Sequence, residues 1–128
     1  MEPMRFRMPV ELEAIDRLAP EVRAAAAAHL PEDRLVAVEI ALVEALSNVV
    51  RHGHPAGEVE IELRPLARGI EVEIADVGNP IPPGLLEAEA PDDPLAESGR
   101  GLALIRTCAD DLRYESSEGR NRLTLTFR

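Results

Sequence analysis

Residues 32–52 read EDRLVAVEIALVEALSNVVRH, and two periodic patterns run through them. In the first pattern, apolar residues recur every three or four positions, which is typical of a helix with a broad buried face. In the second, Glu44, Asn48 and His52 are spaced by four, so they share a separate stripe of the same helix. The first pattern consists of Leu35, Val38, Leu42, Ala45, Leu46 and Val49. This segment therefore predicts a helix that packs on a core, carries a polar stripe and ends at Gly53.

The rest of the chain alternates between helical and strand periodicity. Helices are expected at 11–30, 32–52 and 99–108, and strands at 4–9, 58–63, 70–77, 112–116 and 122–128. Pro20 is expected to bend or divide the first helix. Residues 79–98 are rich in proline, glycine and acidic residues and are expected to form a long loop. The order predicts an α/β (α+β) two-layer sandwich, with a mostly antiparallel mixed sheet covered on one face by about three helices.

Composition narrows the class of protein. The 128 residues are 45% hydrophobic, enough for the core of one domain spanning residues 1–128. The net charge of −10 argues against direct nucleic-acid binding, which requires a basic face. Cys108 is the single cysteine, so an intrachain disulfide is impossible and a reducing compartment fits. Because no apolar run is long enough to span a membrane and no signal peptide is evident, we expect a cytoplasmic protein.

The polar stripe of the 32–52 helix has the residue types needed for phosphate chemistry. Asn48 offers an amide oxygen, a hard neutral ligand suited to a Mg²⁺ ion that keeps most of its waters. Glu44, one turn earlier, could accept a proton from a nucleophile that attacks a metal-bound phosphate. A solvated helix face explains the same spacing, and His52 is better placed as a helix-end residue than as a phosphate contact.

Two further motifs would complete a nucleotide site. In Asp76-Val-Gly78-Asn-Pro80, a carboxylate at a strand end could accept the exocyclic amine of adenine, with Gly78 allowing a close approach of the backbone. In Gly99-Arg100-Gly101-Leu102, free amides at a helix start could bind phosphates, and Arg100 could add a charged contact. An ordinary turn and a helix cap are the alternatives. Together the three motifs describe an ATP site without a P-loop, which a chain lacking lysine cannot form.

These motifs resemble those of the ATPase superfamily of gyrase, heat-shock chaperones and histidine kinases. Within it, the chain is similar to the small bacterial anti-sigma-factor serine/threonine kinases, over nearly its whole length from Leu12 onward. Residues 44–53 are like that family's N-box, 76–80 its adenine box and 97–105 its second glycine box, and 119–123 match the final hairpin. The final hairpin of the family carries a threonine near the adenine, where this chain has Asn121-Arg122.

The resemblance implies a Bergerat-type ATP-binding fold with ATP and Mg²⁺ as cofactors. Asn48 would hold Mg²⁺ and Glu44 would act as the catalytic general base toward a serine or threonine. Adenine would be bound by Asp76 with Gly78, Pro80 and Asn121, and the phosphates by Gly99, Arg100, Gly101 and Leu102. The implied partners are an anti-sigma-factor antagonist of sulfate-transporter-like fold and a sigma factor, and family members often form homodimers.

Other functions of the same site remain open. A non-catalytic module could bind nucleotide and hold a protein partner, or a slow ATPase switch could use Glu44 to activate water. A detached histidine-kinase ATP domain is less favoured, because no phospho-accepting histidine lies in a helical dimerisation segment. The sequence identifies neither the sigma factor nor its antagonist.

Overall fold

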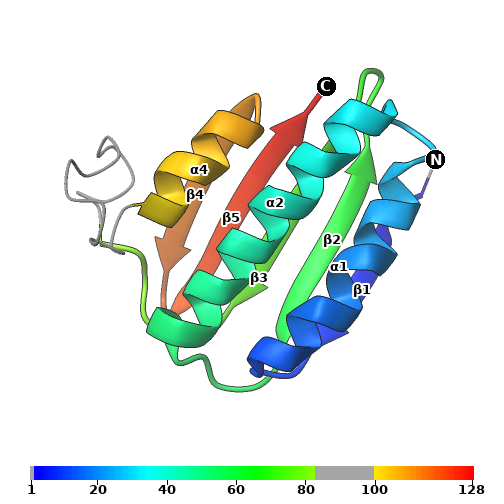
Figure 1. Ribbon diagram of the computed structural model, residues 1–128. Helices are drawn as coiled ribbons and strands as arrows, with labels where there is room; N and C mark the ends of the chain where they lie inside the picture. Colours follow the sequence, from blue (N-terminus) through cyan, green and yellow to red (C-terminus); the bar gives the residue numbers. More distant parts are fainter. Residues whose placement is uncertain (1, 83–99) are drawn as a thin grey trace.

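The computed structural model describes residues 2–82 and 100–128 as one layer of helices on one sheet (Figure 1). In chain order the elements are β1 (Met4–Met8), α1 (Leu12–Ala26), α2 (Glu32–Asn48), the π-helical turn η1 (Val49–Gly53), β2 (Val59–Pro65), β3 (Ile70–Asp76), α4 (Arg100–Cys108), β4 (Asp111–Ser117) and β5 (Arg120–Phe127). Every predicted helix and strand is therefore present, with shifted ends.

The five strands form a sheet in the order β1-β2-β3-β5-β4, and all four pairings are antiparallel. Helices α1, α2 and α4 lie side by side on one face of it (Figure 1). The predicted two-layer sandwich is thus confirmed, and its sheet is antiparallel throughout the part of the chain that the structure describes. Because β5 pairs with β3 as well as β4, the C-terminal strand lies inside the sheet rather than at its edge.

Alternating side chains in β2, β3 and β5 build the core beneath the helices. The buried positions are Val59, Ile61, Leu63, Ile70, Val72, Ile74, Leu123, Leu125 and Phe127, and the helices cover them with Leu, Ile, Val and Ala side chains. The same alternation brings Asp76, the last residue of β3, to the helix side of the sheet. A polar group thereby ends an otherwise apolar column.

The first helix differs from the prediction at both Pro20 and its end. α1 continues through Pro20 and stops at Ala26, four residues before the expected Leu30. Pro20 is exposed, so the carbonyl that it leaves without a helical donor can bind water instead. Ala26 then accepts hydrogen bonds from the amides of His29 and Leu30, which close the helix in a tight turn.

The second helix changes its winding at Asn48. The α-helical pattern was expected to reach His52, but residues 49–53 form the π-helical turn η1, and His54 follows with a left-handed φ of 45°. Such turns are rare and occur often at functional sites. The change begins at one of the predicted site residues.

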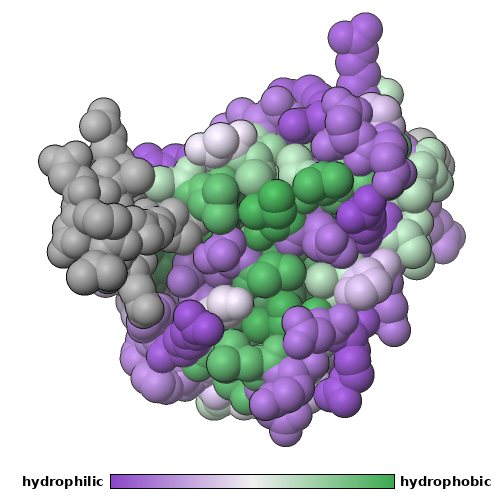
Figure 2. Space-filling view, in the orientation of Figure 1, coloured by the Kyte–Doolittle hydropathy of each residue, from purple (hydrophilic) through white to green (hydrophobic). Residues whose placement is uncertain are grey.

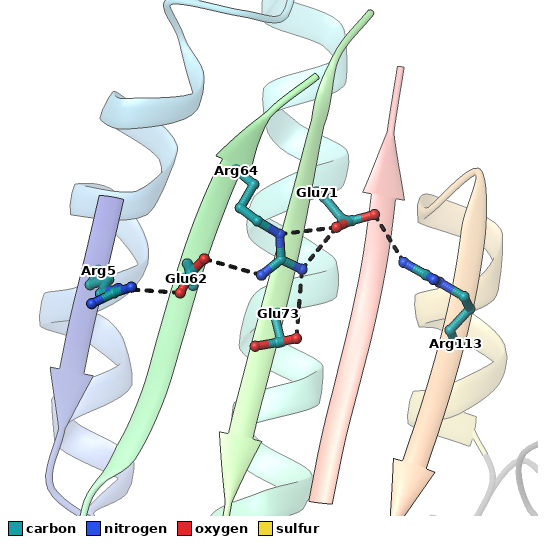
Figure 3. A network of polar contacts seen from close by, with 6 residues as sticks. All are labelled: Arg5, Glu62, Arg64, Glu71, Glu73 and Arg113. Carbon is teal, nitrogen blue, oxygen red and sulfur yellow. Dashed lines mark hydrogen bonds and ion pairs between the residues drawn. The ribbon is translucent and has the colours of Figure 1, made fainter. Parts of the chain in front are cut away.

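The face of the sheet opposite the helices carries a continuous polar network (Figure 3). Arg64 is its centre, with its guanidinium 2.8 Å from Glu71, 3.1 Å from Glu62 and 3.6 Å from Glu73. Arg5 and Arg113 extend the network to β1 and β4 by pairing with Glu62 and Glu71. These carboxylates raise the pKa of Arg64 despite its partial burial. This face is therefore occupied by internal ion pairs, and the predicted site residues on α2 and at the end of β3 lie on the other side.

Candidate nucleotide site

Asp76 and Asn121 form the polar end of the core. They are paired across β3 and β5, and both side chains are buried, with 9% and 2% of their surface exposed. Nδ2 of Asn121 donates to Oδ1 of Asp76 at 3.0 Å and to the carbonyl of Gly78 at 2.9 Å. The hydroxyl of Ser116 donates to Oδ1 of Asn121 at 2.7 Å. The carboxylate of Asp76 is thus held by a side-chain amide from β5.

Burial and this hydrogen bond act in opposite directions on Asp76. Removal from water raises the pKa of its carboxyl, because the charged form is the one that loses hydration, and the Asn121 amide partly offsets the rise. The pKa of Tyr114 is raised as well, mainly by burial of its hydroxyl, and the nearby charge of Asp76 adds to the rise. A buried carboxylate with few partners is well suited to accept a hydrogen bond from a ligand amine.

The loop after Asp76 is fastened to the turn η1. The amide of Asn79 donates to the carbonyl of Gly53 at 2.7 Å, and that of Ala56 donates to the carbonyl of Val77 at 2.8 Å. At Gly78, a β-carbon would lie 2.5 Å from the Gly53 oxygen and 2.9 Å from Cα of Pro55. In the described residues, Gly78 therefore allows a close approach to residues 53–55. Its close approach to an adenine ring stays a prediction.

Pro80 and the start of the predicted long loop follow directly. Pro80 is exposed, and the amide of Ile81 donates to the hydroxyl of Tyr114 at 2.8 Å. Tyr114, on β4, thus secures the chain just before residues 83–99. Those residues include Gly99 and most of the long loop predicted at 79–98, which lie outside the described part of the structure.

Glu44 and Asn48 lie half-buried on α2, one helical turn apart. Glu44 also lines a groove of about 330 Å³ between α1 and α2, together with Asp16, Ala19, Pro20, Glu39, Ile40 and Val43. Hydrophobic surface lies between polar side chains on this helix side of the molecule (Figure 2). The carboxylate of Glu44 is consequently reachable from outside the core.

The predicted phosphate-binding segment begins α4. The helix starts at Arg100, and Leu102 is 4% exposed, so its side chain belongs to the core. A main-chain amide in the first helical turn has no partner within the helix and can bind an anion. The contribution expected from Leu102 is therefore that of its backbone, while the glycines and Arg100 stay predictions.

A magnesium ion bound at α2 would have few protein ligands. No group of three His, Cys, Asp or Glu side chains that could enclose a metal occurs within residues 2–82 and 100–128. The amide oxygen of Asn48 is a suitable single ligand for Mg²⁺, which takes its remaining ligands from water and phosphate oxygens.

Within residues 2–82 and 100–128, none of the helices combines the length and the hydrophobicity of a membrane-spanning segment.

With this geometry, residues 8–127 match the family described as "Histidine kinase-like ATPase domain". The chain belongs to this family. Among curated relatives, the serine/threonine-protein kinase BtrW of Bordetella bronchiseptica is 38% identical over 94 residues, which cover 65% of this chain and 63% of BtrW. The match therefore spans somewhat less than two thirds of that relative.

Solved structures share the fold at low sequence identity. The RsbU and RsbW domains of Rv1364c from Mycobacterium tuberculosis superpose with a TM-score of 0.73 at 17% identity, over 100% of this chain and 32% of that one. The mycobacterial sensor histidine kinase MprB has a TM-score of 0.54 at 22% identity, over 99% of both chains. The catalytic domain of histidine kinase ThkA has a TM-score of 0.57 at 17% identity, over 99% of this chain and 95% of that one. The predicted resemblance and fold are thereby confirmed, and an ATP site is expected of the family.

Two residues that support this site, Ser116 and Tyr114, were not predicted from the sequence. Ser116 and Tyr114 lie on β4 at alternate positions facing the helix side, and both hold the Asp76 region through their hydroxyls. The alternation of 112–116 was visible in the sequence and would have placed both on one face. Their partners were not visible, because the pairing of β4 with β5 depends on long-range register.

Proposed function

We propose that this chain is an ATP-dependent serine/threonine protein kinase that phosphorylates an anti-sigma-factor antagonist of sulfate-transporter-like fold and controls a sigma factor by partner switching. The observation that carries the proposal is the hydrogen bond from the amide of Asn79, in the loop after β3, to the carbonyl of Gly53, at the end of η1. It joins the turn that continues the helix of Glu44 and Asn48 to the loop that follows Asp76. This contact supports the assignment of a candidate base, a metal ligand and an adenine acceptor to one site.

The roles follow from the chemistry of the side chains. Asp76 would accept the exocyclic amine of adenine, and Asn48 would hold Mg²⁺, which neutralises phosphate charge when bound. Glu44 would take the proton of a substrate hydroxyl while the oxygen of that hydroxyl forms a bond to the γ-phosphorus. The bond between the γ-phosphorus and the β–γ bridging oxygen would break at the same time, with ADP as the leaving group. The rate enhancement would come from positioning of the reactants rather than from a covalent intermediate on the protein.

Two observations favour a protein hydroxyl as the acceptor. The groove between α1 and α2 leaves Glu44 open to a side chain from a partner. BtrW, which is 38% identical over 94 residues, bears the name of a serine/threonine-protein kinase. The solved structure with the TM-score of 0.73 contains an RsbW domain. A homodimer is compatible with the proposal. The net charge of −10 argues against direct binding of nucleic acid and so agrees with a protein partner.

The first test is calorimetric titration of the full chain with Mg-ADP and Mg-ATP, in parallel with Asn48→Ala. The wild type is expected to bind at micromolar level and Asn48→Ala to lose the Mg²⁺-dependent part of the affinity. Equal affinity in the two proteins, with and without Mg²⁺, would contradict the assignment of Asn48. No binding by the wild type would contradict the nucleotide site altogether.

The second test separates kinase activity from the alternatives. Labelled ATP is incubated with purified antagonist domains of sulfate-transporter-like fold and either wild type or Glu44→Gln. We expect phosphoserine or phosphothreonine with wild type only, and unchanged ADP affinity in Glu44→Gln. Release of phosphate without protein labelling would indicate a slow ATPase switch, and nucleotide binding without either reaction a non-catalytic module.

A further inference from the structure

The side-chain amide of Asn121 is enclosed by protein groups. Its Nδ2 lies 3.0 Å from Oδ1 of Asp76, 2.9 Å from the carbonyl of Gly78 and 3.5 Å from that of Asn79, while its Oδ1 accepts from Ser116. The reverse orientation would place Oδ1 of Asn121 against a carboxylate and carbonyls, so this orientation is the one that the surroundings allow.

Counting donors shows what remains for a ligand. A primary amide has two hydrogens, and Asp76 and Gly78 each accept one of them at ordinary hydrogen-bond lengths. Asn121 is also only 2% exposed. Asn121 therefore has no donor left for a nucleotide.

The carboxylate of Asp76 has an acceptor to spare. Within residues 2–82 and 100–128, its hydrogen bond from a side chain goes to Oδ1, which leaves Oδ2 as an acceptor. The bond to Asn121 fixes the rotation of the carboxylate, and the bond from Asn121 to Gly78 ties it to the loop that follows β3. The same amide opposes the rise that burial causes in the pKa of Asp76, and so favours the ionised acceptor.

We propose that Asn121 is a positioning residue that acts on the base only through Asp76, holding one carboxylate oxygen so that the other selects 6-aminopurines over 6-oxopurines. The inference rests on the nucleotide site of the proposed function and deepens it. A carboxylate accepts from the amine of adenine but repels the oxygen of hypoxanthine, and an unpaired buried acceptor costs about 1–3 kcal/mol, or roughly 5- to 150-fold in affinity.

The test exchanges the recognised group without changing its shape. In Asp76→Asn, Asn121 would hold the new amide by its oxygen and turn its NH₂ toward the base, so the preference should invert from Mg-ADP to Mg-IDP. In Asp76→Asn with Asn121→Leu, nothing orients that amide, and the preference should fall to about twofold or less, a free-energy difference of ~0.4 kcal/mol. Dissociation constants for both nucleotides are measured by calorimetry on all variants.

Ser116→Ala is the matched control, because it removes a hydrogen bond to Asn121 while leaving both amide donors in place. It should keep the wild-type preference for Mg-ADP, and thermal unfolding without nucleotide checks that each variant is folded. An ADP-to-IDP ratio in Asp76→Asn that is the same with and without Asn121→Leu would overturn the inference while leaving the nucleotide site intact. Failure of the wild type to bind either nucleotide would overturn the proposed function and this inference with it.

Discussion

Replacing Gly78 by alanine tests whether the turn η1 and the loop after β3 form one packed unit. An added β-carbon would lie 2.5 Å from the carbonyl oxygen of Gly53, 2.9 Å from Cα of Pro55 and 3.1 Å from Oδ1 of Asp76. Two of these neighbours are backbone atoms, which cannot rotate away. Ordinary contact starts near 3.4 Å, so residues 53–55 would have to retreat by about 0.9 Å from Gly78.

That displacement has a calculable cost. Overpacking against a rigid neighbour costs about 1–3 kcal/mol. The retreat also lengthens the bonds from Asn79 to Gly53 and from Ala56 to Val77, now 2.7 and 2.8 Å, each worth about 1 kcal/mol. With partial relaxation we expect Gly78→Ala to lose about 3 kcal/mol of unfolding free energy, and roughly 10 °C in melting temperature for a chain of this size.

Gly53 supplies the matched control from the opposite side of the same contact. A β-carbon there would meet its nearest neighbours only at 3.8–3.9 Å. Gly53→Ala should therefore melt within about 2 °C of wild type, because alanine also favours helical winding. Urea unfolding and thermal melting of both variants decide the matter. Equal stability of Gly78→Ala and Gly53→Ala would refute the claim that packing, rather than nucleotide approach, requires glycine at 78.

Two further predictions concern charge. Burial raises the pKa of Asp76 above its ordinary 3.8, so the protonated carboxyl stabilises the folded state, and this stabilisation is lost as pH rises from about 3.8 through the raised pKa. The free energy of unfolding in urea, measured across that pH range, should therefore depend less on pH in Asp76→Asn than in the wild type. An unchanged slope would contradict the raised pKa of Asp76. Arg34 donates to the carbonyls of Cys108 and Arg128 and pairs with Asp110 at 3.2 Å. Arg34→Ala should cost about 1–3 kcal/mol of unfolding free energy, because two carbonyls lose a charged donor and Asp110 loses its ion pair while keeping the bond from the amide of Arg128. Adding Arg34→Ala to Asp110→Ala should cost less than Arg34→Ala alone, and full additivity would show that the pair is not coupled.

Much of the fold followed from short-range patterns. The neighbouring strands at 58–63 and 70–77 were predicted from the sequence, and in the structure Gly69, with a φ of 83°, lies in the turn between β2 and β3. Helix ends were less predictable. Pro20 did not divide α1 because its exposed side leaves the freed carbonyl to water, a property that depends on which face of the helix meets the core.

The candidate site divides in the same way. The spacing of Glu44 and Asn48 and the strand-end place of Asp76 are local properties, so the residues by themselves determine a polar stripe and a terminal carboxylate. The contacts of Asn121 and Gly78 come from the folded chain: 43 and 45 residues separate Asn121 from Gly78 and Asp76. Sequence periodicity tells which face a side chain occupies, because it reflects backbone geometry over a few residues. Which group it meets there depends on strand register and helix packing across the whole chain, and only the assembled core specifies them.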